Sequence, residues 1–354
     1  MFSSVRRLGA VLRSEGGVYD HVLGEPSRLG YLRLALRPAR TDPSRHGDEV
    51  LFDYSAQKVG GTEEMFGRRV PVVNPYECFK GLRLRLLLVL TLFLTRERQR
   101  VLAASIVAHA VTGQVGGIRR SFLWNPGNLV SLALAHTLPN VNVYVLAPEY
   151  PLVEGAELFF SNETVLDIHQ IPTAQRRVVR RQHDFVSDDL KFVFYPSQLS
   201  TVGNELFEEM LLLDLFRDVA ASATIPIEIR PHYHDQKHGL PTWFLDEFGD
   251  HVVFSQPSSL GCLSTRQVSF SCHSSIGYEL IGLGVVHGII GPLPGGMRER
   301  HSCPALNRWF RTSPFVLSAT DLASWPQRMS DAFPTQLSRH PDLLSLSDRV
   351  VAEL

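Results

Sequence analysis

Apolar and polar residues follow two rhythms along most of the chain after residue 119. Short runs rich in Val, Ile, Phe and Tyr are typical of buried strands, and longer runs with apolar residues three and four apart are typical of helices. The predicted strands are residues 120–126, 140–149, 191–197, 225–232, 251–257, 267–273 and 285–291. The predicted helices are residues 127–139, 203–222, 241–249, 274–284, 322–333 and 343–354. This alternation predicts an α/β fold built on doubly wound parallel sheets.

The first 118 residues give a weaker pattern. Residues 31–39 and 49–56 resemble strands bounded by Pro, Gly and Asp. Residues 86–94 form the most apolar run, which is much shorter than the roughly 20 residues that cross a bilayer. We interpret this run as a buried core helix. The alternative is a peripheral contact with anionic lipid, because arginines flank the run. These arginines are Arg83, Arg85, Arg96, Arg98 and Arg100.

A polar, highly charged segment divides the chain near its middle. Residues 175–188 have no clear apolar face, so they are either a linker between two α/β domains or a solvated helix inside one domain. With 354 residues the chain is long enough for two domains. We predict an N-terminal α/β domain of residues 1–185, a Rossmann-like domain of residues 186–320 and a helical tail of residues 321–354.

Composition limits the classes of function. Apolar residues make up 44% and charged residues 20% of the chain, and the net charge of −1 argues against a general nucleic-acid coat protein. Any anion binding must therefore be local. The four cysteines show no metal or disulfide spacing, which predicts buried free thiols in a reducing compartment. The first residues lack the apolar core of a secretion signal, so we expect a cytoplasmic protein, with the inner face of the membrane as the alternative location.

Two loops at the ends of predicted strands are suited to binding a phosphate. The first contains Ser197, Gln198, Ser200 and Thr201 and leads into a predicted helix. Backbone N–H groups and the helix dipole at such a point can hold an anion, and the hydroxyls add donors. Ordinary helix capping by Ser or Thr is the alternative.

The second loop repeats this arrangement after the strand at 267–273. It contains His273, Ser274, Ser275 and Gly277, and the glycine permits a close approach of backbone to phosphate. Glu279, one turn further on, is a candidate acceptor for the hydroxyls of a ribose. Capping is again the alternative, with Glu279 as a surface charge.

A basic motif follows the strand at 225–232. In RPHYHD, Arg230 and His232 place positive charge where it can compensate a departing phosphate. The HxH spacing could also bind a metal, but no CxxC or HExxH accompanies it, so we predict no metal site.

The order of these three motifs resembles the bacterial sialyltransferases and polysialyltransferases, and the capsule Kdo transferases share the layout. SQLS at residues 197–200 matches the first loop of these families, RPHYH matches their HP motif with Tyr233 in place of proline, and Ser274 and Ser275 match their serine pair. The resemblance covers roughly residues 120–290. It implies a GT-B fold, in which two Rossmann-like domains face each other across a cleft and the C-terminal domain binds a CMP-sugar.

The resemblance implies an inverting, metal-independent glycosyltransferase without a cofactor. It would move sialic acid or a related acidic sugar from a CMP-activated donor to a glycan or glycolipid acceptor, with His232 acting on the leaving group. A carboxylate must take the proton of the acceptor hydroxyl. The acidic motif of the families is only partly present at Val153-Glu154-Gly155, so Glu154 is the first candidate base and Glu149 the second. Glu63 and Glu64 are further candidates.

Two other functions remain open from the sequence. A GT-B transferase that uses a UDP- or dTDP-sugar would have a similar helix start and ribose-binding glutamate. A non-catalytic subunit that binds a nucleotide sugar would share the donor loops but transfer nothing. A Rossmann dehydrogenase is disfavoured because no GxGxxG follows a predicted strand.

Overall fold

The computed structural model describes most of the chain. The described residues are 5, 6, 8, 10, 27–37, 43, 47–53, 68–79, 81–115, 118–124, 128–145, 148–150, 152–179, 185–196, 227–232, 235, 239–252, 263–272, 274–292, 302–318, 321 and 324–339.

The chain forms two compact units that exchange short segments. Unit 1 comprises Met1–Ser161, His169–Arg181 and His301–Cys303, and unit 2 comprises Asn162–Ile168, Gln182–Arg300 and Pro304–Leu354. The passage from Arg181 to Gln182 falls inside the charged segment 175–188. The described residues of that segment, 175–179 and 185–188, contain no α-helix, so the expected solvated helix is absent from them.

Unit 1 is built on a five-stranded sheet in which every pairing is parallel. The spatial order is β2-β1-β3-β4-β5, so the chain starts in the interior of the sheet, adds β2 on one side and then continues on the other side. This is the strand order 2-1-3-4-5 of doubly wound folds. The strands are β1 (Glu49–Phe52), β2 (Val72–Val73), β3 (Arg120–Trp124), β4 (Val141–Val145) and β5 (Glu157–Phe160).

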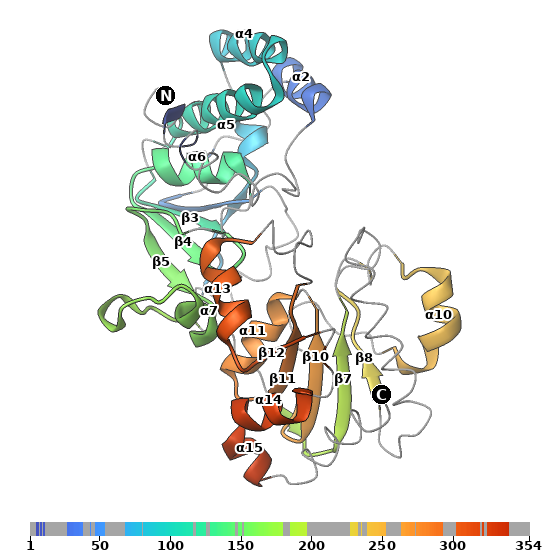
Figure 1. The fold of residues 1–354 in the computed structure, drawn as a ribbon. Helices are drawn as coiled ribbons and strands as arrows, with labels where there is room; N and C mark the ends of the chain where they lie inside the picture. The colour runs from blue at the N-terminus through green and yellow to red at the C-terminus, as the bar shows by residue number, and fades with distance from the viewer. Residues whose placement is uncertain are drawn as a thin grey trace. The chain divides into compact units, whose positions relative to one another are not determined.

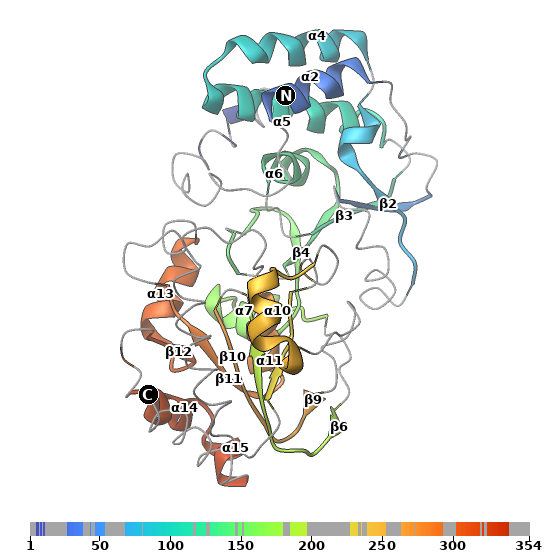
Figure 2. The ribbon, with the colours of Figure 1, turned by 90° about the vertical axis from the view of Figure 1, so that its right-hand side faces the viewer.

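The helices of unit 1 are stacked outward from this sheet (Figures 1 and 2). α6 lies nearest the sheet, α5 packs on α6, and α4 with its neighbour α2 lies outermost. The elements are α2 (Arg28–Leu36), η3 (Pro75–Cys78), α4 (Leu82–Leu90), η4 (Thr91–Phe93), α5 (Arg96–Thr112), α6 (Leu129–Thr137) and η5 (Thr173–Gln175).

The strand expected at residues 31–39 is wrong, because residues 31–36 belong to helix α2; residues 38 and 39 lie outside the described residues. Arg28–Leu36 contains no β-branched residue and is rich in Leu, Arg and Ala, which are good helix formers. The side chain of Ser27 caps the helix by accepting a hydrogen bond from the N–H of Gly30. Tyr31 and Ala35, one turn apart, are its buried positions.

Unit 2 repeats the same topology. Its five parallel strands have the order β12-β11-β10-β7-β8, which is again 2-1-3-4-5 when counted from β7. The strands are β7 (Lys191–Tyr195), β8 (Ile227–Ile229), β10 (Gln267–Ser271), β11 (Val286–Ile290) and β12 (Val316–Leu317). A small second sheet pairs β6 (Phe185–Ser187) with β9 (Leu263–Ser264).

Short helices connect and cover the strands of unit 2. They are α7 (Glu163–Ile168), α10 (Thr242–Phe248), η6 (Gly249–His251), α11 (Ser275–Gly282), α13 (Pro304–Thr312), α14 (Trp325–Ala332) and α15 (Pro334–Arg339). α11 joins β10 to β11 and packs against β11 and α7. The ring of Trp325 in α14 stacks on Phe270 of β10 at 5.4 Å between ring centroids.

Two Rossmann-type units in one chain confirm the predicted α/β, GT-B-like fold class. The strands expected at 49–56, 120–126, 140–149, 191–197, 225–232, 267–273 and 285–291 are all present. Of the strand expected at 251–257, Val252 forms an isolated parallel bridge with Ile229, and residues 253–257 lie outside the described residues. The helices expected at 203–222 and 343–354 also lie outside them. The spacing of apolar residues did not predict the helices α5 and α13.

α11 approaches the sheet of unit 2 so closely that only glycine fits at position 277. A Cβ atom there would lie 2.8 Å from Ser271 Oγ and 2.9 Å from His287 Nε2. His287 is fully buried between two serines: its Nδ1 lies 2.9 Å from Ser269 Oγ and its Nε2 lies 2.9 Å from Ser271 Oγ. Ser269 donates its proton to the carbonyl of Val286 at 3.2 Å, so its oxygen accepts from Nδ1–H and Nε2 accepts from Ser271.

This buried histidine makes stability depend on pH. Burial lowers the pKa of His287 to about 3 and that of His169 to about 4, from 6.5. The unfolded chain therefore binds more protons below about pH 6.5, so the free energy of unfolding falls as the pH falls. We expect His287→Asn to flatten that dependence by about 1.4 kcal/mol per pH unit between about pH 4.5 and 5.5, as measured by urea unfolding.

Ser271→Ala is the matched control for this pH experiment. It removes one partner of the imidazole but keeps the buried histidine, so the protein should be less stable while the pH dependence of its free energy of unfolding stays that of the wild type. A His287→Asn slope equal to the wild-type slope would show that His287 does not carry the effect.

Candidate functional site

The loops that follow β7 and β10 start side by side at the centre of the unit 2 sheet. The register pairs Tyr195 with Ser271, the last residues of the two strands. From β7 the chain first adds β8 on one side and later returns to place β10 on the other side, so this pair marks the topological switch point. Open parallel sheets bind their ligands at the carboxyl ends of the strands at such a point.

The N-terminus of α11 lies at this switch point with its capping position open. Ser274 occupies the N-cap in an extended conformation, but its side chain makes no capping hydrogen bond. The capping explanation for Ser274 is therefore excluded. Ser274 is half-buried, Ser275 is exposed, and Glu279 is half-buried one turn further into the helix. Two hydroxyls and the first N–H groups of the helix are thus available to an anion.

Gly277 has a different reason for being glycine than the one expected from the sequence. Its N–H group donates to the carbonyl of Ser274 at 3.0 Å, and the hydrogen on its Cα faces Ser271 and His287. The absence of a side chain therefore serves helix–sheet packing. The predicted part of Gly277 in donor binding stays a prediction.

The other residues of these two loops fall outside the described residues. These are Ser197, Gln198, Ser200, Thr201 and His273, and their predicted part in donor binding stays a prediction.

In the described part of the basic motif after β8, His232 is exposed and Arg230 is buried. His232 is exposed, and its carbonyl accepts a hydrogen bond from the N–H of Asp235 at 2.9 Å. Arg230 is 4% exposed and holds Glu228 Oε2 through Nε at 3.0 Å and Nη2 at 2.6 Å. Lys191 Nζ contacts the other oxygen of Glu228 at 3.1 Å. Arg230 thus belongs to a buried ion triad, and His232 is the member of the motif that faces solvent.

The triad stands beside a buried phenol at the switch point. Burial raises the pKa of the Tyr195 hydroxyl above its ordinary value of 10.0, while the nearby positive charge of Arg230 lowers it in part. Tyr195 is therefore neutral at physiological pH. Of the triad, Arg230 lies nearest the carboxyl edge of the sheet, whereas Lys191 reaches Glu228 from the start of β7.

The two glutamates proposed as the base lie at opposite edges of the unit 1 sheet. Glu154 is exposed just before β5, on the edge where the strands begin. It lines a cavity of about 570 Å³ there together with Arg119, Arg120 and His136. Glu149 is half-buried after β4, on the carboxyl edge, and its carbonyl accepts a hydrogen bond from the N–H of Cys303 at 2.9 Å. Only Glu149 is at the edge where parallel sheets bind ligands. Glu63 and Glu64 lie outside the described residues.

Asp53, which is not among the residues expected from the sequence, is a carboxylate at the switch point of unit 1. Asp53 follows β1 directly, is 3% exposed, and its N–H group donates to the carbonyl of Val73 at 3.1 Å. Because Phe52 pairs with Leu123, the register places Asp53 beside Trp124, the last residue of β3. The signal was present in EVLFD, where a buried strand ends in an acidic residue.

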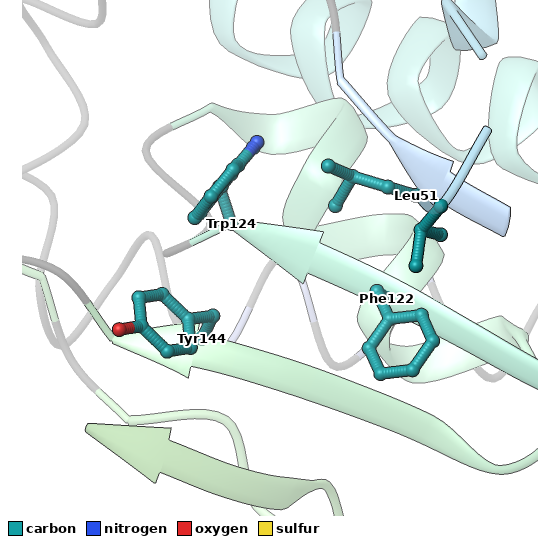
Figure 3. Packing of buried hydrophobic residues seen from close by; sticks show 5 residues of the cluster. Leu51, Phe122, Trp124 and Tyr144 are labelled. Carbon is teal, nitrogen blue, oxygen red and sulfur yellow. The ribbon is translucent and has the colours of Figure 1, made fainter. Parts of the chain in front are cut away.

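An aromatic cluster fixes the strand ends around Asp53. Trp124 and Tyr144 meet edge to face at 5.5 Å between ring centroids and pack with Leu51 and Phe122 on one face of the sheet (Figure 3). The hydroxyl of Tyr144 donates to the carbonyl of Val179 at 2.7 Å. The cluster includes residues at the ends of β3 and β4, the edge of the sheet at which Asp53 follows β1.

Among the described residues, no group of three or more His, Cys, Asp or Glu side chains could hold a metal ion. The described cysteines Cys78, Cys272 and Cys303 are buried free thiols. No helix in this part of the chain is both long and apolar enough to cross a membrane.

Comparison with protein-family models and with curated proteins gives no match. Among solved structures, the chain is similar to UDP-GlcNAc 2-epimerase from Neisseria meningitidis bound to UDP-GlcNAc. That likeness has 12% identity and a TM-score of 0.41, and covers 84% of this chain and 93% of the other. A trehalose-6-phosphate synthase gives 9% identity and a TM-score of 0.37 over 87% of this chain and 96% of the other. UDP-N-acetylglucosamine 2-epimerase from Rickettsia bellii gives 10% identity and a TM-score of 0.40, and the likeness covers 86% of this chain and 95% of the other. Because all three TM-scores are below 0.5, we draw no conclusion about activity from them.

The ion triad around Glu228 generates a prediction about stability. Glu228→Gln keeps the size of the side chain but leaves Lys191 and Arg230 without their negative partner in a mostly buried place. We expect the free energy of unfolding, measured with urea at pH 7, to fall by about 3 kcal/mol. The control is Glu154→Gln, which is exposed and should change it by less than about 0.5 kcal/mol. Equal losses in the two variants would contradict a special role for Glu228.

Proposed function

We propose that the protein is an inverting, metal-independent glycosyltransferase that uses a CMP-activated acidic sugar, such as sialic acid, as its donor. The observation that carries the proposal is the placement of the three motifs that resemble bacterial sialyltransferases. They follow β7, β8 and β10, which are neighbours in one parallel sheet, and the ends of β7 and β10 border its switch point.

In this proposal unit 2 binds the donor. The open N-terminus of α11 holds the phosphate through the hydroxyls of Ser274 and Ser275, and Glu279 accepts hydrogen bonds from the ribose. His232 follows β8, which lies beyond β7 from β10, and supplies positive charge or a proton to the departing phosphate. Arg230 has an indirect role in this proposal. Its ion pair with Glu228 holds the backbone that carries His232.

Unit 1 supplies the proton acceptor in the proposed reaction. The acceptor hydroxyl attacks the anomeric carbon as the bond to the phosphate oxygen breaks, and a carboxylate takes the hydroxyl proton. We propose Asp53 for this role, because it is a buried carboxylate at the switch point of its sheet. Glu149 is the second choice at the same edge. Glu154, on the opposite edge, is a weaker candidate than its sequence suggests.

The test of the donor is hydrolysis measured with a panel of CMP-, UDP- and dTDP-sugars, with and without a chelator. We expect turnover with a CMP-sugar that the chelator leaves unchanged. Ser274→Ala combined with Ser275→Ala should raise KM at least tenfold with a small change in kcat, since the hydroxyls bind the donor.

The panel also separates the alternatives. Turnover only with a UDP- or dTDP-sugar would replace the CMP donor. Donor binding without turnover, in the wild type as in His232→Ala, would identify a non-catalytic subunit. Under the proposal, His232→Ala lowers kcat by two orders of magnitude or more, and circular dichroism shows the fold intact.

The assignment of the base predicts an ordering of three variants. Asp53→Asn should lower kcat for transfer to an added acceptor by at least a hundredfold, because the amide cannot take the hydroxyl proton. Glu149→Gln should cost less, and Glu154→Gln should leave kcat within about twofold. The measurement is the rate of sugar transfer at saturating donor, with the affinity for CMP as a control that all three variants preserve. A large loss in Glu154→Gln alone would return the role to Glu154.

A further inference from the structure

The outermost helix of unit 1 exposes an apolar stripe that no described element covers. Leu82, Leu86 and Leu90 of α4 and Phe93 of η4 are 74%, 57%, 60% and 84% exposed. Their spacing of four, four and three residues places them within an arc of about 80° on one side of the helix. The apolar run at residues 86–94, expected to be a buried core helix, is helical in α4 and η4. It is not a core helix, because Leu88 is the only leucine of α4 that is fully buried. Packing within unit 1 leaves this stripe to solvent.

The neighbouring helix α2 continues the exposed apolar surface. Leu29 and Leu36 are 66% and 72% exposed, and both views place α2 next to α4 on the outside of unit 1 (Figures 1 and 2). Arg33 and Arg37 lie on the same side of α2, since they follow Leu29 by one and two turns. We refer to the exposed residues of α2, α4 and η4, with the start of α5, as the α2–α4 surface.

Charge on this surface is predominantly positive. Residues 28–37 and 82–100 contain eight arginines and one glutamate, although the whole chain has a net charge of −1. Arg33, Arg37, Arg83, Arg96 and Arg98 are exposed. A second copy of this chain would meet the surface with the same positive charge, which disfavours self-association through it. A partner that is apolar beneath a negatively charged layer is complementary to both features.

We propose that the α2–α4 surface docks on a membrane that contains anionic lipids. The leucines and Phe93 enter the boundary between headgroups and acyl chains, and the arginines contact lipid phosphates. α4 has nine residues, so it lies in the plane of the interface and does not span the bilayer. This inference stands on unit 1 alone and does not depend on the proposed transferase activity.

The test uses the full chain and sedimentation with sucrose-loaded vesicles. One set of vesicles is phosphatidylcholine alone, and the other is equal parts phosphatidylcholine and phosphatidylglycerol. We expect at least tenfold stronger binding to the anionic vesicles at 0.1 M salt, and weaker binding at 0.5 M salt because the salt screens the arginines.

Two sets of substitutions separate the apolar and the cationic contributions. Leu86→Gln, Leu90→Gln and Phe93→Gln together should lower binding to anionic vesicles at least tenfold. Arg83→Gln, Arg96→Gln and Arg98→Gln together should abolish the preference for phosphatidylglycerol. The matched control is Trp243→Gln with Leu245→Gln, which alters two apolar residues of α10 that are each 42% exposed and should leave binding unchanged.

Three outcomes would overturn the proposal. They are no binding of the wild type to anionic vesicles, an equal loss in the α10 control, and a wild-type dimer that the leucine substitutions dissociate while vesicle binding persists. The last outcome would assign the surface to contact between copies of the chain. Circular dichroism and the unfolding midpoint show whether each variant is folded. Donor hydrolysis of the free protein should be the same in all of them, so a failure here is distinct from a failure of the proposed function.

Discussion

The close approach of α11 to the unit 2 sheet is the contact on which the candidate donor site depends. Without a side chain at Gly277, the helix comes near enough for Ser271 and His287 to fill the space beneath it. The imidazole is neutral and completely hydrogen-bonded between Ser269 and Ser271, so a polar group is buried there without an unsatisfied donor or acceptor. This contact fixes the N-terminus of α11 beside the end of β7. The positions of Ser274 and Ser275 follow from it.

Both units use the same strand order, and in each the first strand of the sheet borders the switch point. Unit 2 places two serine hydroxyls and a helix N-terminus near that point, whereas unit 1 places the buried carboxylate of Asp53 there. The same topology therefore presents different polar groups in the two units.

The α2–α4 surface lies on the outermost helices of unit 1, whereas Asp53 lies at the carboxyl edge of its sheet. The segments that form this surface, residues 28–37 and 82–100, include eight arginines and one glutamate, in a chain whose net charge is only −1. The surface lies on the outermost helices of its unit, so its exposed leucines are not part of the hydrophobic core. The leucines of α4 are unusual only in facing outward, since the helix itself is well formed and rests on α5.

The sequence by itself determined the alternation of strands and helices, and hence the parallel sheets, because the period of apolar residues is a local property of the chain. It also identified the strand ends after β7, β8 and β10. Only the tertiary structure decided what each polar group faces. Glu154 lies at the amino edge, Arg230 is held by Glu228, Gly277 serves packing, and Asp53 reaches a switch point. Each of these depends on which distant segment lies alongside, as does the exposure of the leucines in α4, and no local pattern carries that information.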